Sequence, residues 1–301
     1  MRQARSPAAA MSTLRATAIG FSAILMWSLL AVLTVASGQV PPFQLAALTF
    51  AIGGAIGAVW MVRARAWGAL RQSPRAWTLG VGGLFGYHAL YFLSLRLAPP
   101  AEAGLVNYLW PLLIVLFSGL LPGERLRWYS VAGALLGFSG TVVLFLGKGL
   151  TPALGSATGY AAAFMAAFVW SIYSVLSRRL AGVPTAAVAG FCLATASLAT
   201  LCHLIFETSV WPQDVWQWLA VVALGVGPVG IAFYAWDIGV KRGDIRLLGV
   251  GSYAAPILST LFLVLAGYAE ARATLVLAAL LIAGGGLLAA QDMLRRPARR
   301  P

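Results

Sequence analysis

Charge is scarce in this 301-residue chain, and acidic charge is scarcest: eight Asp and Glu stand against 21 Lys and Arg. Charged residues make up 10% of the sequence, whereas a soluble domain carries about 25%. This deficit excludes an ordinary soluble domain, and the 60% of hydrophobic residues indicates a membrane protein. Cysteine is also rare. Cys192 and Cys202 fall on one predicted helix about 15 Å apart, which is too far for a disulfide.

The few acidic residues lie near the ends of apolar stretches, so no stretch carries paired carboxylates at its centre. The sequence also lacks an HExxH motif and a Ser–His–Asp set at membrane depth. We therefore expect no enzymatic activity, no metal site and no cofactor. Asp237 precedes Lys241 by one helical turn, which predicts an ion pair. Residues 225–230 have dinucleotide-motif spacing but lie inside an apolar helix, which indicates packing or a hinge.

Ten apolar stretches are long enough to cross a bilayer as helices, which need about 20 residues each. The predicted spans are 14–36, 43–62, 76–97, 100–121, 128–147, 157–178, 185–206, 215–237, 244–266 and 273–292. With the N-terminus in the cytoplasm, only Arg96, Lys148 and Arg272 lie on the outer side. The other Lys and Arg lie inside, as the positive-inside rule requires. Charges dispersed over loops form no contiguous patch for nucleic acid.

The two halves of the chain are related by a shift of 145 positions. Residues 80–113 then fall on 225–258 without a gap, which pairs Tyr108 with Tyr253 and Pro111 with Pro256. We expect a first five-helix repeat over 1–150 and a second over 151–301. Because five is odd, the second repeat must be inverted in the membrane. The fold class is therefore all-α, with ten transmembrane helices in two inverted repeats and both termini cytoplasmic.

The N-terminal run weakly imitates a signal peptide. However, Trp27-Ser28 within it matches Trp170-Ser171 of the sixth span, so we expect this segment to be retained.

Proline and glycine mark special points along the predicted spans. Pro111 and Pro256 each remove a helical hydrogen bond, which frees the carbonyls of Asn107 and Ser252. A bare carbonyl is costly in lipid, so both breaks should face protein or water. Gly53 with Gly57, and Gly133 with Gly137, predict faces for close helix packing.

Large aromatic and polar side chains gather near the centres of several spans. If these faces converge, they line a central cavity with rings and a few polar groups. Seven tryptophans at span ends fit an interfacial belt instead: Trp60, Trp67, Trp77, Trp128, Trp211, Trp216 and Trp218. The candidate substrate-binding residues are Trp27, Tyr87, His88, Tyr91, Asn107, Tyr108, Trp110, Pro111, Trp170, Tyr173, Trp236, Ser252, Tyr253 and Pro256.

His88 is the titratable side chain nearest the centre of a span. Three roles stay open for it: a hydrogen-bond donor to substrate, a proton carrier, or a neutral strut between spans three and four. With no carboxylate at mid-membrane, a carboxylate proton relay is not expected, and facilitated diffusion or exchange remains open. His203, near an outer helix end, is expected at the interface.

This pattern resembles the EamA-type drug/metabolite transporter superfamily over the whole chain. Asn107-Tyr108-Leu109-Trp110-Pro111 and the Tyr87-His88 pair further resemble the YddG-type exporters of aromatic amino acids. The resemblance implies a multi-pass protein of the bacterial inner membrane that exports Trp, Phe and Tyr by alternating access, with no obligate protein partner. A ring-lined site suits flat apolar ligands independently of the resemblance.

Other functions stay open at this stage. The same scaffold could carry another amphiphile, such as a quaternary ammonium drug like methyl viologen, because cations bind over ring faces. An intramembrane enzyme finds no support in the motifs. A receptor or scaffold lacks the soluble signalling domain that such a role would usually need.

Overall fold

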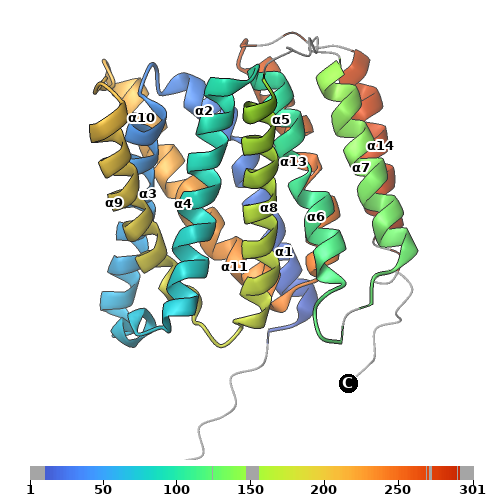
Figure 1. The fold of residues 1–301 in the computed structure, drawn as a ribbon, viewed down its shortest axis with the longest axis horizontal. Helices are drawn as coiled ribbons and strands as arrows, with labels where there is room; N and C mark the ends of the chain where they lie inside the picture. The colour runs from blue at the N-terminus through green and yellow to red at the C-terminus, as the bar shows by residue number, and fades with distance from the viewer. Residues whose placement is uncertain are drawn as a thin grey trace, which may run out of the picture.

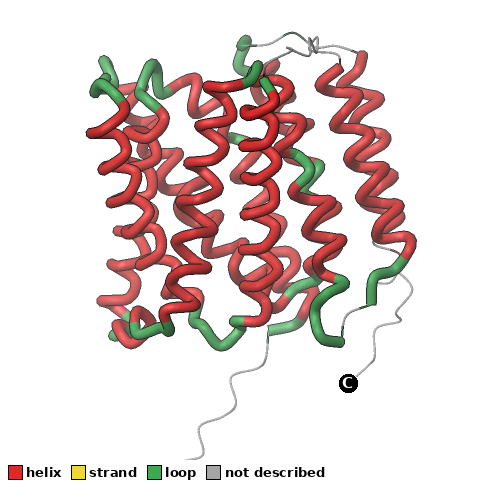
Figure 2. Tube along the Cα trace, in the orientation of Figure 1, coloured by secondary structure: helices red, strands yellow, loops and turns green. Residues whose placement is uncertain are grey.

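Each predicted span forms one helix or a run of consecutive helices in the computed structural model. The structure describes residues 11–123, 125–146, 156–268, 270, 273–289 and 291. Within these residues the regular elements are all helical (Figure 2). The α-helices are α1 (Thr13–Ser28), α2 (Leu30–Ala36), α3 (Pro42–Arg63), α4 (Pro74–Leu97), α5 (Pro100–Asn107), α6 (Trp110–Ser118), α7 (Trp128–Leu146), α8 (Ala157–Arg179), α9 (Val188–Phe206), α10 (Val215–Val226), α11 (Ala232–Arg242), α12 (Ile245–Gly251), α13 (Ala254–Leu265) and α14 (Ala273–Ala289). Two 3-10 turns, η1 (Trp67–Leu70) and η2 (Thr185–Ala187), and a π-helical segment, η3 (Gly227–Ile231), complete the set.

Eight helical segments of the described chain are long and apolar enough to cross a membrane. Two further apolar helices, Glu102–Ser118 and Ala273–Ala289, are shorter. The chain is therefore a multi-pass membrane protein. The helical stretch that starts at Val215 runs to Arg242, five residues beyond the predicted end of that span.

Several helices begin where a side chain caps them. The Ser73 hydroxyl accepts a hydrogen bond from the backbone N–H of Ala76 and thus starts α4, and Asp214 accepts one from Gln217 to start α10. Asp244 caps α12 by accepting from Arg246 and Leu247. Each cap satisfies N–H groups that have no partner within the helix.

Two helical stretches are interrupted at equivalent places, as the prolines predict. The first breaks between α5 and α6 just before Pro111, and the second between α12 and α13 just before Pro256. The predicted free carbonyl at Ser252 is not observed, because the backbone N–H of Ala255 donates to it at 3.0 Å. A tight turn therefore restores a bond that the proline removes.

The helices form a single bundle in which the strongest packing joins helices far apart in sequence. These pairs are α1 with α11, α3 with α9, α4 with α8, and α7 with α14. The α7–α14 pair lies at one end of the bundle and α9 with α10 at the other, while α4 and α8 cross its middle (Figure 1). The largest buried core lies between these groups, at the centre.

The start of α1 and the end of α14 lie on the same side of the bundle (Figure 1). This side also carries the basic ends of α3, α8 and α11 and the start of α4, and we call it the basic side. Its arginines include Arg63, Arg75, Arg178, Arg179 and Arg242. Arg96, at the end of α4, lies on the opposite side.

Both predicted small-residue faces make close helix contacts. A Cβ on Gly133 would lie 2.6 Å from the carbonyl oxygen of Gly285 in α14, and one on Gly53 would lie 2.8 Å from Cα of Gly230. Atoms cannot approach so closely, so only glycine permits these backbones to meet. The predicted packing is confirmed, and η3, within the dinucleotide-like motif, is one of its partners.

Six of the seven tryptophans predicted for the interfacial belt are exposed. Trp128 and Trp216 are 74% and 75% exposed, and Trp60, Trp67, Trp211 and Trp218 are exposed as well. Trp77 is the exception, since its ring packs inward against Phe191 at 5.2 Å between centroids. Trp77 still lies in the first turn of α4, but its ring turns toward a neighbouring helix.

Candidate substrate site at the centre of the bundle

A cluster of aromatic rings occupies the centre of the bundle, between α1, α3, α4, α6, α8 and α11. Both halves of the chain contribute to it. We define the ring cluster as Trp27, Phe50, Tyr87, His88, Tyr91, Trp110, Trp170, Tyr173, Phe233 and Trp236, each in ring contact with another member. Eight predicted site residues thus meet here, and a ninth, Asn107, is hydrogen-bonded to Tyr87 at the edge.

Tryptophan forms the middle of the ring cluster. The Trp27 ring lies 5.1 Å from Trp236 and 5.5 Å from Trp170 between centroids, and Trp110 meets Trp170 edge-on at 6.4 Å. Edge-to-face and tilted contacts of this length are the favourable arrangement of aromatic rings. The four tryptophans therefore form one continuous aromatic surface shared by both halves.

Hydrogen bonds hold two of these indoles, one of them to the other half of the chain and one within the second half. Nε1 of Trp27 donates to the carbonyl of Pro228 at 2.9 Å, and Nε1 of Trp236 donates to the Ser174 hydroxyl at 3.0 Å. The Pro228 carbonyl lies in η3, where the π-helical geometry changes the normal bonding pattern. Trp110 is fixed through its backbone, because the Ser171 hydroxyl donates to its carbonyl at 2.9 Å.

His88 sits among rings and uses one nitrogen within its own helix. Nδ1 lies 2.7 Å from the carbonyl of Leu84, so this nitrogen carries a proton and donates. Phe50 meets the imidazole edge-on at 5.0 Å and Tyr87 does so at 5.0 Å. This arrangement fits a neutral imidazole whose Nε2 can accept a hydrogen bond.

Asn107 and Tyr87 supply the polar edge of the ring cluster. Nδ2 of Asn107 donates to the Tyr87 hydroxyl at 3.0 Å, which leaves that hydroxyl free to donate its own proton. Oδ1 of Asn107 is buried and has no hydrogen-bond partner. Leaving a buried polar atom unpaired costs about 1–3 kcal/mol. Such an atom is a candidate acceptor for a ligand.

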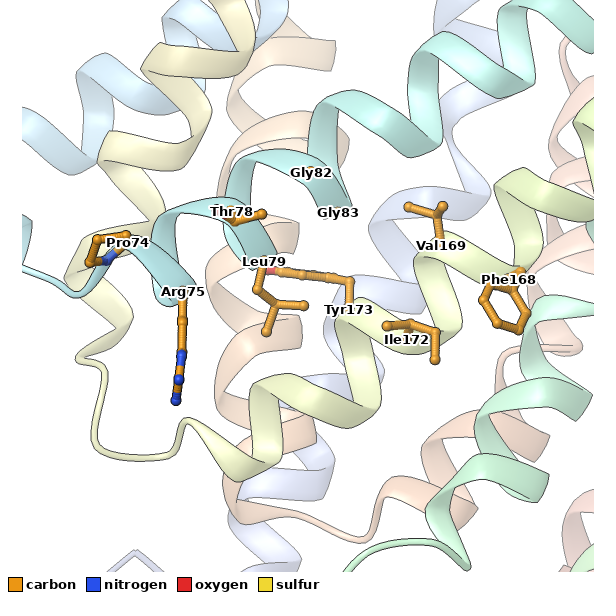
Figure 3. Close-up of a pocket in the computed structure, with 10 residues that line it drawn as sticks. All are labelled: Pro74, Arg75, Thr78, Leu79, Gly82, Gly83, Phe168, Val169, Ile172 and Tyr173. Carbon is orange, nitrogen blue, oxygen red and sulfur yellow. The ribbon is translucent and has the colours of Figure 1, made fainter.

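The members of the ring cluster differ in exposure. Trp110, Trp170, Tyr173, Phe233 and Trp236 are buried, whereas Trp27, Tyr87, His88 and Tyr91 are half-buried. A cavity of about 560 Å³ lies between α4 and α8, and Tyr173 is the member of the ring cluster that lines it (Figure 3).

Comparison with known proteins assigns the family. The model of the EamA-like transporter family matches this chain twice, over residues 14–146 and 157–291. The chain belongs to the EamA-like transporter family. It is therefore a membrane transporter, and the predicted family is confirmed.

Named relatives of this EamA-family transporter span nearly its whole length. It is 62% identical over 284 residues to the aromatic amino acid exporter YddG of Ancylobacter novellus, covering 93% of this chain and 98% of the relative. The aromatic amino acid exporter YddG of Escherichia coli is 28% identical over 293 residues, covering 92% and 97%. A solved crystal structure with 60% identity superposes with a TM-score of 0.90, covering 95% of this chain and all of that one.

Four predicted site residues of the transporter lie away from the ring cluster. Tyr108 packs on Phe145 of α7, and Tyr253 is fully buried beside Phe138 of α7. The Ser252 hydroxyl donates to the carbonyl of Leu248 within its own helix, and Pro256 is buried in α13. Pro111 adjoins Trp110, and its carbonyl faces Gly249 of α12.

Sequence reasoning missed three residues that the structure places at the centre. Phe50 and Phe233 stack with centroids 5.4 Å apart and planes 12° apart, next to His88. Ser174 accepts the Trp236 bond. A phenylalanine in an apolar span gives no sign of where it points. Ser174, however, follows Trp170 by one helical turn, so helical spacing could have found it.

Polar networks close the bundle on both sides of the ring cluster. On the basic side, the Lys241 ammonium lies 2.7 Å from Oδ1 of Asp237, which confirms the predicted ion pair, and both side chains are buried. On the opposite side, Glu207 accepts from the backbone of Phe43 and Gln44, from His203 and from Arg96. His203 lies in the last turn of α9, near the predicted outer end, and its side chain is buried in this network.

Proposed function

We propose that this transporter exports aromatic amino acids across the bacterial inner membrane. The observation that carries the proposal is the ring cluster, in which Trp27 and Trp110 of the first half meet Trp170 and Trp236 of the second. A site of this kind would hold a flat ring by edge-to-face and stacked contacts. The names of the A. novellus and E. coli relatives point to the same substrate class.

The backbone groups of an amino acid would find partners at the polar edge. Oδ1 of Asn107 is an unpaired acceptor for the substrate ammonium, and the Tyr87 hydroxyl is a donor for its carboxylate. Nε2 of His88 would accept from an indole or phenol. The ring would lie among the tryptophans, so selectivity would arise from aromatic area and not from charge.

We further propose ten spans in two inverted five-helix halves with cytoplasmic ends. The packing supports this. In the proposed repeat, α1 corresponds to α8 and α4 corresponds to α11. Exchanging the two halves therefore converts the α1–α11 contact into the α8–α4 contact, and the bundle contains both. The same exchange superimposes the breaks before Pro111 and Pro256, and the family model matches each half once. The basic side would face the cytoplasm.

Such a fold would transport by alternating access, with the rings parting toward one side at a time. The networks at Asp237 and at Glu207 would act as the two closures. Proline interruptions in α5–α6 and α12–α13 supply points at which helices can bend.

Export of organic cations is the weaker alternative. Ring faces attract cations, but the carboxylate nearest to Tyr173 on α11, Asp237, is already paired with Lys241. An amino acid brings its own negative charge and needs no such partner. We therefore expect methyl viologen to compete poorly.

Counterflow in proteoliposomes tests the proposal. Vesicles loaded with unlabelled tryptophan should accumulate labelled tryptophan, and excess phenylalanine should suppress this while lysine should not. Trp170→Leu should lower the exchange rate more than tenfold, because this ring contacts Trp27, Trp110 and Trp236. Trp128→Leu is the matched control, since that ring is 74% exposed at a helix end. Failure of the wild type to exchange any aromatic amino acid would refute the proposal.

A further inference from the structure

The groove between α4 and α8 on the basic side shares one residue, Tyr173, with the ring cluster and otherwise lies outside the proposed transport site. Its volume is about 560 Å³, and Pro74, Arg75, Leu79, Gly82, Ile172 and Tyr173 are among the residues that line it. In Figure 3 the Tyr173 ring extends from α8 toward Leu79 of α4. Gly82 and Phe168 are exposed, so the groove opens to the outside of the bundle and thus to lipid.

The dimensions of the groove fit a hydrocarbon chain. It runs along α4 from Pro74 to Gly83, which is about 13 Å at 1.5 Å per residue. One leaflet of the hydrocarbon core is about 15 Å deep. The groove therefore begins at the membrane surface and ends near the middle of the bilayer, as an acyl chain does.

The chemistry of the lining selects among possible occupants. Arg75 is the one charged side chain that lines the groove, and it lies at the surface end, while Leu79, Val169 and Ile172 line the interior. No carboxylate is among the lining residues, so the groove offers nothing to balance the charge of a cationic ligand. A lipid with an anionic head group would place its phosphate at Arg75 and its acyl chain against the apolar interior of the groove.

We propose that this groove is a binding site for an anionic phospholipid, with the phosphate at Arg75 and one acyl chain between α4 and α8. The proposal does not depend on which substrate is transported. Because α4 and α8 both carry rings of the central cluster, a lipid in the groove would contact the helices that must move.

Two variants separate the two ends of the site. Arg75→Gln removes the charge and leaves the groove open. Gly82→Leu fills the groove, since no atom lies within 4 Å of a Cβ built at Gly82 and the new side chain meets no obstacle there. Matched controls are Arg71→Gln, an exposed arginine in the connection that precedes α4, and Gly286→Leu, an equally open glycine in α14.

Native mass spectrometry of the delipidated full chain, titrated with dioleoyl phosphatidylglycerol or dioleoyl phosphatidylcholine, measures the binding. Wild type should prefer phosphatidylglycerol about fivefold, which corresponds to about 1 kcal/mol for one arginine at the surface. Arg75→Gln should lose this preference and still bind both lipids. Gly82→Leu should lower the affinity for both at least tenfold, and the controls should match wild type.

Three results would overturn the assignment. The first is equal binding of the two lipids by the wild type. The second is binding of phosphatidylglycerol by both Arg75→Gln and Gly82→Leu with the affinity of the controls. Displacement of phosphatidylglycerol by tryptophan would instead assign the groove to the transported substrate. The counterflow assay measures exchange of tryptophan by the wild type separately. A failure of the proposed transport is therefore distinguished from a failure of lipid binding.

Discussion

Replacing Asp237 by Asn should destabilise the transporter strongly, because it leaves a buried ammonium without its counter-ion. The carboxylate lies 2.7 Å from Lys241 Nζ through Oδ1, and its Oδ2 accepts from the Thr185 hydroxyl at 2.7 Å. The two charged side chains are 3% and 5% exposed. Lys241 also donates to the carbonyl of Val183, so the pair connects α11 to the turn before α9.

The magnitude follows from the burial. Breaking one partner of a buried pair costs about 3–5 kcal/mol, mostly because the remaining charge stays desolvated. Replacing both partners with apolar residues of similar volume is often neutral or stabilising. We therefore expect Asp237→Asn to lower the free energy of unfolding by about 3–5 kcal/mol, and the double variant Asp237→Leu with Lys241→Met to recover most of it.

Reversible unfolding in SDS, followed by tryptophan fluorescence, measures these differences. Asp214→Asn is the matched control, since this aspartate caps α10 on the surface and asparagine caps helices about as well. A single variant within 1 kcal/mol of wild type would contradict the reasoning. So would a double variant as unstable as the single one, because the loss would then come from packing and not from an unpaired charge.

Two further predictions concern polar groups near the rings and at the opposite side. Ser174→Ala should lower the free energy of unfolding by about 1–3 kcal/mol in the same assay, since it leaves the buried Trp236 N–H unpaired, whereas exposed Ser197→Ala should not. Glu207→Gln should lower the free energy of unfolding by about 2–3 kcal/mol, because the Glu207 side chain is 2% exposed and accepts hydrogen bonds from Phe43, Gln44 and His203. Arg96→Gln should cost less than 1 kcal/mol, as its side chain is 51% exposed. Equal losses for Glu207→Gln and Arg96→Gln would contradict this account.

Most of the helical structure could be predicted from the sequence, because a bilayer fixes the length of an apolar helix and polar residues mark its ends. The predicted span 43–62 is Pro42–Arg63, and 157–178 is Ala157–Arg179. The breaks near Pro111 and Pro256 were also predictable, since proline cannot continue the bonding pattern.

The candidate site could be predicted only where residue type and helix phase agree. Trp27 and Trp170 stand at matching places in the two halves, and both reach the centre. Tyr108 precedes Trp110 by two residues, which places it about 200° around a helix, and it faces α7 instead. Phe50 and Phe233 could not be found, because apolar residues on an apolar helix carry no sign of direction. Only tertiary packing decides which of them turn inward.

The polar networks on the two sides of the bundle differ in strength, and under the proposed alternating access this difference would decide which side opens more easily. On the basic side, Arg178 donates to the carbonyls of Val240 and Gly243, and the buried Asp237–Lys241 pair lies beside it. On the opposite side, Arg96 is the residue that ties α4 to Glu207, and it is half exposed, so that contact contributes at most about 1 kcal/mol. Moving α4 away from α9 on the opposite side therefore breaks a weak contact, whereas opening the basic side exposes buried charges. For an exporter, the easier opening would be the one that releases substrate.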